Sequence, residues 1–406
     1  MPKKLKKIDS EAFQGCSSLT KLTLPDSVAR IDGLAFCGCS GLTELTLPNS
    51  VKSIGDGAFA DCSGLEKITV ESGNSCYDSR DNCNSIIETE TNTLIAGCKN
   101  SVIPNSVTSI GNSAFCGCSG LTELTLPDNI HFIEGEAFMG CSGLTELTLP
   151  NSVKSIGRYA FQGCTGLTEL TLPNCVRVVE ACAFAYCSGL TELTLPNNVK
   201  SIGRCAFQGC TGLTELTLPN CVRVVEACAF AYCSGLTELT LPNSVTRIGN
   251  HAFDSCSGIT KLTLPNSVKS IGRYAFQGCS GLTELTLPNS VKSIGDRAFA
   301  YCSGLTELTL PNSVTSIGNC AFGGCSGLTE LTLPNSITSI GDYAFAYCRD
   351  LSKITSLAEI PPMCGFKVFN GVNKTNCELI VPEGSVAAYT RAEDWNKFSN
   401  IRGFSK

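Results

Sequence analysis

The sequence is poor in charged residues and histidine, and it has no long apolar run. Charged side chains make up 16% of its 406 residues and hydrophobic ones 43%, so the chain can bury a continuous core and is not disordered. A formal net charge of −6 argues against a general nucleic-acid or anionic-membrane binder. Because no run of about 18 apolar residues is present, no membrane-spanning helix is expected.

The beginning of the chain lacks the pattern of an export signal. It reads MPKKLKKIDSEAF, which is basic but has no apolar stretch behind it. It also enters a repeat part-way through, so we expect either an expressed fragment or a chain whose export signal has been removed.

Catalytic motifs are scarce. The two histidines, His131 and His251, lie several repeats apart, and each replaces a variable surface residue. No glycine-rich phosphate loop follows a strand, and the recurring GCSG or GCTG is a turn that closes each repeat, not a nucleophile elbow. Since no active site needs a nucleophile in every repeat, the sequence predicts no enzyme, no catalytic residue and no cofactor.

Cysteine, by contrast, is abundant, and half of the 27 residues share one repeat position. A cysteine fixed at one place in every repeat is expected to act as a small buried hydrophobe in a stacked ladder, not as half of a disulfide. The cysteine count therefore does not decide the compartment. The position is occupied by Cys16, Cys39, Cys62, Cys118, Cys141, Cys164, Cys187, Cys210, Cys233, Cys256, Cys279, Cys302, Cys325 and Cys348.

An internal repeat accounts for nearly the whole chain. An Ala-Phe pair places its Phe at 13, 36 and 59, and then at 115 and every 23 residues to 345. Residues 161–206 reappear as 207–252 until the second copy diverges near Ser244. Such duplication predicts a solenoid of about fifteen coils, because a solenoid grows by stacking and not by enlarging one core.

One coil, residues 282–304, shows the role of each position: LTELTLPNSVKSIGDRAFAYCSG. LTELTL alternates as a strand does, so its leucines should point inward and Glu284 and Thr286 outward. Pro288 and Asn289 then turn the chain. A second short extended segment follows, and Gly295 is expected to relax the backbone at the next bend. The remaining inward positions are Val291, Ile294, Ala298, Phe299 and Cys302.

The pattern LxxLxLPxSVxxIGxxAFxxCxxL resembles the BspA-like class of leucine-rich repeats. The resemblance covers nearly the whole chain, and its Ala-Phe and Cys positions separate this class from other leucine-rich repeats. It implies a leucine-rich repeat solenoid of parallel β-strands, with short second strands and turns or short helical segments, used for adhesion or protein binding. It also implies a location at the cell surface or outside the cell; a cytoplasmic location is the alternative, since this chain shows no signal peptide.

Two segments depart from the repeat, so we divide the chain into a solenoid, residues 1–350, and a C-terminal capping unit, residues 351–406. Within the solenoid, residues 71–104 form an enlarged coil, with strand candidates at 85–87 and 93–95 joined by a hairpin turn. This insert is either part of a binding site or a tolerated insertion on one edge. In the capping unit we expect a strand ending at 381–382, a short helix through 385–389, and Trp395 in the core.

The outward strand position is glutamate in ten of fourteen coils, beside a column of threonines. One interpretation is an acidic groove for a basic or extended partner, and the other is a solvated face kept charged against aggregation. Like charges about 4.8 Å apart repel, so the column should cost some stability. The candidate binding residues are Glu123, Glu146, Glu169, Glu192, Glu215, Glu238, Thr148, Thr171 and Thr194.

A third column, two residues before each Phe, is variable and therefore expected to be exposed. Four consecutive coils place Cys182, Cys205, Cys228 and His251 there. One column spans about three coil rises, whereas zinc needs its four ligand atoms within about 2.3 Å, so no metal site is predicted.

The leading hypothesis is a monomeric module that binds a protein partner, such as a host matrix protein or another cell-surface protein. The alternative is a structural spacer that displays a domain outside this sequence. Near-identical coils favour the spacer, because a specific site usually needs variation between coils.

Overall fold

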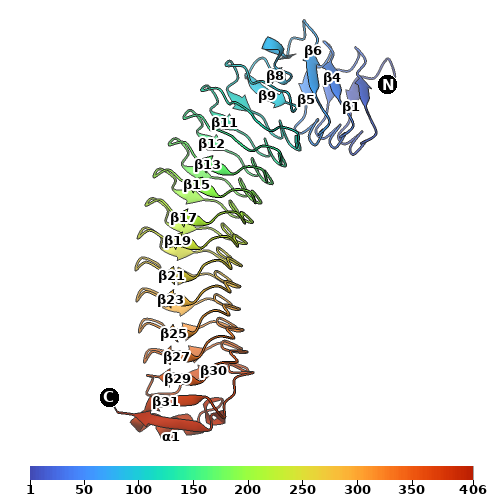
Figure 1. Ribbon diagram of the computed structural model, residues 1–406. Coiled ribbons are helices and arrows are strands. Elements are labelled where there is room, and N and C mark those ends of the chain that lie inside the picture. Colours follow the sequence, from blue (N-terminus) through green and yellow to red (C-terminus); the bar gives the residue numbers. More distant parts are fainter. Residues whose placement is uncertain (406) are drawn as a thin grey trace. The chain divides into compact units, whose positions relative to one another are not determined.

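The computed structural model describes residues 1–405 and has the predicted architecture, a solenoid of parallel β-strands with little helix (Figure 1). It contains about 17 turns with a repeat of about 23 residues, against the fifteen expected from the sequence. The chain divides into two units, residues 1–200 and residues 201–405, and each is described by itself.

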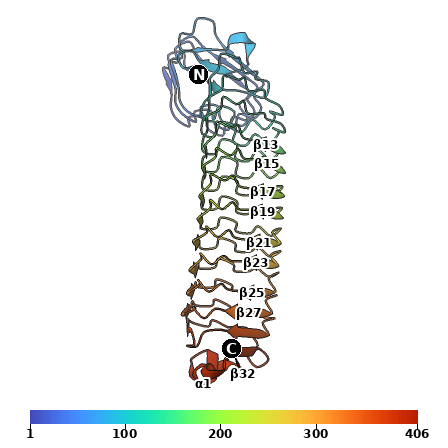
Figure 2. The same cartoon turned by 90° about the vertical axis from the view of Figure 1, so that its left-hand side faces the viewer.

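The LTELTL segments form the first column of strands, which we call the first-segment strands. In the first unit they form the parallel sets β2 (Lys21–Thr23), β4 (Glu44–Leu47) and β6 (Lys67–Val70), and β13 (Glu169–Thr171) with β15 (Glu192–Thr194). In the second unit the sets are β17 (Glu215–Thr217) with β19 (Glu238–Thr240), β21 (Lys261–Thr263) with β23 (Glu284–Thr286), and β25 (Glu307–Thr309), β27 (Glu330–Leu333), β29 (Lys353–Ser356), β31 (Glu378–Pro382) and β32 (Asn400–Phe404). Figure 2 shows these arrows stacked along one face of each unit.

Two-residue strands of the second extended segment, the second-segment strands, form a more regular ladder. In the first unit they are β1 (Lys7–Ile8), β3 (Arg30–Ile31) and β5 (Ser53–Ile54), and then β10 (Ser109–Ile110), β11 (Phe132–Ile133), β12 (Ser155–Ile156) and β14 (Val178–Val179). In the second unit they are β16 (Ser201–Ile202), β18 (Val224–Val225), β20 (Arg247–Ile248), β22 (Ser270–Ile271), β24 (Ser293–Ile294), β26 (Ser316–Ile317), β28 (Ser339–Ile340) and β30 (Met363–Cys364).

The phenylalanines form the predicted interior column. Within each unit, neighbouring rings lie nearly parallel with centroids 5.1–5.8 Å apart. This is the offset stacking that aromatic rings prefer, and most of the rings have no exposed surface. The column runs on beyond the last regular repeat, because Phe369 stacks on Phe345 at 5.8 Å.

The cysteine ladder is buried from Cys39 onward, whereas Cys16 in the first coil is exposed. Most of these buried thiols donate a hydrogen bond to the Phe carbonyl of the preceding coil; the Sγ–O distance is 3.1 Å from Cys256 to Phe230 and 3.3 Å from Cys302 to Phe276. Cys118, which follows the enlarged coil, instead donates to Gly97 O at 3.8 Å. Cysteine therefore fills the space of a small hydrophobe and satisfies a buried carbonyl that alanine would leave bare. The predicted cysteine ladder is confirmed. The hydrogen bonds that its thiols donate were not predicted from the sequence.

Left-handed backbone recurs at two positions of the coil, two residues before and two residues after each Phe. In the coil of Phe276 these are Tyr274 (φ 59°) and Gly278 (φ 68°). The turn aims each amide along the solenoid axis: Tyr274 N donates to Asp296 O (2.9 Å) and Gly278 N to Ala300 O (2.8 Å). Hydrogen bonding to the next coil thus offsets the cost of a positive φ at non-glycine residues.

Two expectations about single positions need correction. Cys205, Cys228 and His251, in the variable column, are half-buried and not fully exposed, since left-handed backbone turns that column partly toward the next coil. Gly295 does not have a positive φ; a Cβ there would lie 2.7 Å from Ile271 O. Glycine is needed at 295 because two coils approach closely, not because the bend needs freedom.

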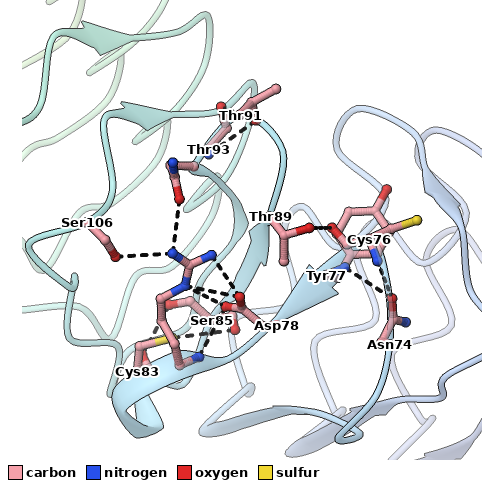
Figure 3. A network of polar contacts seen from close by, with 12 residues as sticks. Asn74, Cys76, Tyr77, Asp78, Cys83, Ser85, Thr89, Thr91, Thr93 and Ser106 are labelled. Carbon is pink, nitrogen blue, oxygen red and sulfur yellow. Dashed lines mark hydrogen bonds and ion pairs between the residues drawn. The ribbon is translucent and has the colours of Figure 1, made fainter.

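The insert contains the predicted hairpin. β8 (Ile86–Glu88) and β9 (Thr93–Ala96) are antiparallel, and a further strand, β7 (Tyr77–Asp78), pairs with β8. After β7 comes a short 3-10 helix, η1 (Arg80–Asn82). Figure 3 shows the polar contacts that hold it: Arg80 Nε lies 2.8 Å from Asp78 Oδ1, and Nη1 lies 2.9 Å from Asn92 Oδ1 and 3.3 Å from Ser106 Oγ. One guanidinium thus joins the insert to the coil that follows it.

The C-terminal segment buries Trp395 as predicted. After β31 come η2 (Glu383–Ser385), α1 (Val386–Arg391), η3 (Trp395–Lys397) and β32, a closing strand that the sequence did not indicate. The Trp395 ring has no exposed surface, its Nε1 donates to Pro362 O (3.0 Å), and its edge meets Phe369 at 5.2 Å. The last Phe of the column therefore packs against this segment and not against water.

We expect the free energy of unfolding to fall steeply above about pH 9. Burial raises the pKa of the Cys187, Cys279 and Cys348 thiols to about 12, whereas an unfolded thiol ionises near 9. Since the folded pKa is the higher one, this contribution is fully present below about pH 9. It is lost between about pH 9 and 12, at about 1.4 kcal/mol per thiol and pH unit.

Chemical denaturation at a series of pH values measures this slope. The control is the triple variant Cys187→Ala, Cys279→Ala and Cys348→Ala, which should lose about 4 kcal/mol less per pH unit. An equally steep decline in both proteins would mean that other groups cause it.

Arg80→Ala should loosen the insert without unfolding the repeats. Removing the guanidinium leaves the Asp78 carboxylate and the Asn92 amide without their partner, a loss of about 1–2 kcal/mol of local stability. Hydrogen exchange should therefore accelerate in residues 77–96. The exposed Arg177→Ala serves as the control, and equal exchange in the two variants would show that the network does not stabilise the insert.

Candidate functional site

The candidate acidic column lies on the exposed face of the first-segment strands. All six glutamates and all three threonines named from the sequence are exposed, because strand alternation turns the intervening leucines inward. Equivalent residues pair in parallel register, Glu169 with Glu192 and Thr171 with Thr194 in the first unit. In the second unit Glu215 pairs with Glu238. The arrangement therefore repeats carboxylates and hydroxyls at the strand spacing.

A hollow of about 580 Å³ opens on this face in the first unit. It brings together Glu146 and Glu169 with Thr148, Thr171 and Thr194. Asn151, Asn174, Pro173 and Pro196 line its other side. Glu123 and Glu192 do not line the hollow, and Glu215 and Glu238 belong to the second unit.

The hollow lies where the strand ladder opens, which corrects the prediction that every LTELTL forms a strand. Residues 122–127 and 145–150 form no strand, only an isolated bridge between Glu123 and Glu146. The enlarged coil before them supplies no first-segment strand, so these two segments lose an edge partner. β13 pairs with β15 and with no other named strand, so the ladder is also open between residues 146 and 169; similar breaks separate β19 from β21 and β23 from β25 in the second unit.

The charges around the hollow are not neutralised. Elsewhere on this face lysines pair with the column: Lys261 Nζ lies 2.8 Å from Glu284, and Lys353 Nζ lies 3.0 Å from Glu330. Within residues 1–405, neither Glu146 nor Glu169 makes an ion pair. Two exposed carboxylates beside threonine hydroxyls can accept hydrogen bonds from a cationic group and attract it electrostatically.

The thiols and the imidazole of the variable column contact other protein groups. Burial, and to a smaller extent the neighbouring Cys205, raises the pKa of the Cys228 thiol to about 11. This thiol therefore stays protonated at neutral pH. His251 Nδ1 lies 2.8 Å from Asp254 Oδ2, and its ring stacks on Tyr274. Within residues 1–405 no three His, Cys, Asp or Glu side chains are placed to hold a metal ion.

Sequence analysis missed a set of exposed tyrosines. They occupy the left-handed position two residues after Phe, where other coils have glycine. The only signal in the sequence was an alternation of Tyr and Gly at that position, which has no meaning until the φ angle is known. The four are Tyr186, Tyr232, Tyr301 and Tyr347.

The comparisons with known proteins agree with this fold. The family described as "BspA type Leucine rich repeat region (6 copies)" matches residues 1–96, 85–213, 177–304 and 246–376. A leucine-rich repeat protein from Bacteroides ovatus is 25% identical with a TM-score of 0.56, over 93% of this chain and 87% of that one. A leucine-rich cell surface protein from Faecalibacterium prausnitzii is 28% identical with a TM-score of 0.51, over 83% and 86% of the two chains.

No curated protein sequence matches the chain. The α-helix described in residues 1–405 is six residues long, and no helix in this range has the length and apolarity to traverse a bilayer.

Proposed function

Because this chain belongs to the BspA-type leucine-rich repeat family, we propose that it is a non-catalytic protein-binding or adhesion module that acts at the cell surface. It recognises a basic, extended segment of a protein partner on the acidic face of its first unit. The observation that carries the proposal is the 580 Å³ hollow, whose rim holds two carboxylates without an ion-pairing partner. A monomer suffices, since one chain supplies the whole surface.

Three further observations support the proposal. Leucine-rich repeat folds generally mediate protein–protein interactions, and the similar Faecalibacterium protein is a cell surface protein. Parallel register repeats the Glu and Thr positions along the strand face, so a linear partner can meet several equivalent sites. The printed contacts of the two histidines are with a backbone carbonyl and a carboxylate: His131 Nδ1 lies 2.6 Å from Asn129 O, and His251 Nδ1 lies 2.8 Å from Asp254 Oδ2. That arrangement favours binding over catalysis.

A structural spacer is the second candidate, favoured by the near-identity of residues 161–206 and 207–252. A structural spacer requires uniform coils, but it does not require a gap between neighbouring first-segment strands. Binding that maps to the hollow would select the module, and binding that maps only to sequences flanking this chain would select the spacer.

Neutralising the two rim glutamates, Glu146 and Glu169, together with Glu192 on the next coil should weaken binding of a basic peptide. The variant carries Glu146→Gln, Glu169→Gln and Glu192→Gln, and the probe is fluorescent oligolysine at low and high salt. Three exposed ion pairs of up to about 1 kcal/mol each predict about tenfold weaker binding or more at low salt. Its salt dependence should flatten as well.

A matched control removes the same charge elsewhere. Glu215→Gln, Glu238→Gln and Glu307→Gln lie on the same face of the second unit and outside the hollow, and like the rim glutamates they make no ion pair among the described residues. This triple variant should bind oligolysine nearly as the wild type does. Equal losses in the two variants would mean that only net charge matters, and no loss in either would remove the acidic face as a site.

A further inference from the structure

Two exposed tyrosines mark a second surface, on the turns of the second unit that follow β24 and β28. Tyr301 is 60% exposed and Tyr347 is 51% exposed, and both have φ 61°. A bulky aromatic residue at positive φ is strained, and an exposed ring gains little from burial. The chain offers glycine at this position in neighbouring coils, such as Gly278 and Gly324, so the strain is not required by the fold.

The two rings bound a narrow slot of about 100 Å³. Its floor is Gly323–Gly324, and Arg297, Cys320 and Tyr343 complete its walls. A Cβ on Gly324 would lie 2.6 Å from Cδ1 of Tyr301, so the ring lies against the glycine backbone. The absence of a side chain at 324 therefore creates the slot.

The lining of the slot is mainly apolar. The Arg297 guanidinium is held over the Tyr274 ring at 5.5 Å, one coil before Tyr301, so the polar groups of the slot are chiefly tyrosine hydroxyls, which can donate and accept. No carboxylate lines the slot among the described residues. An apolar ligand rich in carbonyl acceptors suits this set better than a sugar, whose many hydroxyls need acceptors as well.

The distance between the Tyr301 and Tyr347 rings further restricts which ligand the slot can bind. Tyr301 and Tyr347 are two coils apart, which is about 9.6 Å at the spacing of hydrogen-bonded strands. A polyproline II helix has three residues per turn and rises about 3.1 Å per residue, so it repeats every 9.3 Å or so. Such a helix along the turn surface would present equivalent faces to both rings. Its proline residues have carbonyls and no amide donors.

We propose that the slot between Tyr301 and Tyr347 binds a proline-rich segment in the polyproline II conformation. The rings pack against its pyrrolidine faces, and the tyrosine hydroxyls donate to its carbonyls. The segment is already extended in solution, so little conformational entropy is lost on binding. The site is separate from the acidic face of the first unit and does not depend on it.

Fluorescence anisotropy with labelled oligoproline tests the proposal. Tyr301→Gly and Tyr347→Gly use the residue that neighbouring coils carry at this position, so both variants should fold. Each should weaken binding at least about tenfold, as expected for loss of an aromatic anchor. The control is Tyr159→Gly, which also replaces a tyrosine at positive φ (60°) but lies in the first unit and outside the slot.

Three outcomes would overturn the site. They are no saturable binding of oligoproline to the wild type, equal weakening by Tyr159→Gly, or binding of a soluble β-glucan oligosaccharide, but not oligoproline, that Tyr301→Gly abolishes. Circular dichroism of each variant confirms folding. Oligolysine binding should be unchanged in all three variants, so failure of this site and failure of the acidic face are distinguishable.

Discussion

The structure depends on the contact between one coil and the next. A single coil cannot bury its apolar side chains, and only a neighbour in the same register covers its Phe, Cys and Leu positions. Ring centroids 5.1–5.6 Å apart in the first unit, and thiols that donate to the preceding Phe carbonyl, are the two repeating forms of that contact. The backbone amides of the left-handed residues also donate hydrogen bonds to carbonyls of the next coil. Register is therefore fixed by side chains and backbone together.

This constraint divides the chain into columns that cannot vary and columns that can. Close approach of backbones fixes Gly295, and burial fixes the Phe and Cys columns. The outward strand position and the left-handed turn position are free to change from coil to coil. The two proposed binding surfaces lie on these free positions: carboxylates beside an opened ladder at residues 146 and 169, and tyrosines beside Gly324. Few positions differ in sequence between coils, and those that differ are mainly exposed to solvent.

Sequence periodicity predicted the interior well, because burial follows position in the repeat. It predicted the Phe and Cys columns, the hairpin of the insert and the buried Trp395. It could not predict positive φ at Tyr274 or Tyr301, since Tyr rarely adopts that region and no local pattern marks it. Nor could it locate the hollow at Glu146, because an unpaired strand results from a missing partner in the enlarged coil, not from the segment's own residues. The glutamates were predicted as exposed; their role in binding stays a prediction.

Removal of one coil tests the stacking account most directly. Deleting residues 282–304 joins Gly281 to Leu305 and restores the sequence of a regular junction. Deleting residues 282–293 instead brings strand positions against turn positions. The account predicts that the first variant unfolds cooperatively near the wild-type denaturant midpoint, while the second loses the ordered second unit. Equal stability of the two deletion variants would contradict it, because the interior would then not depend on equivalent side chains meeting in register.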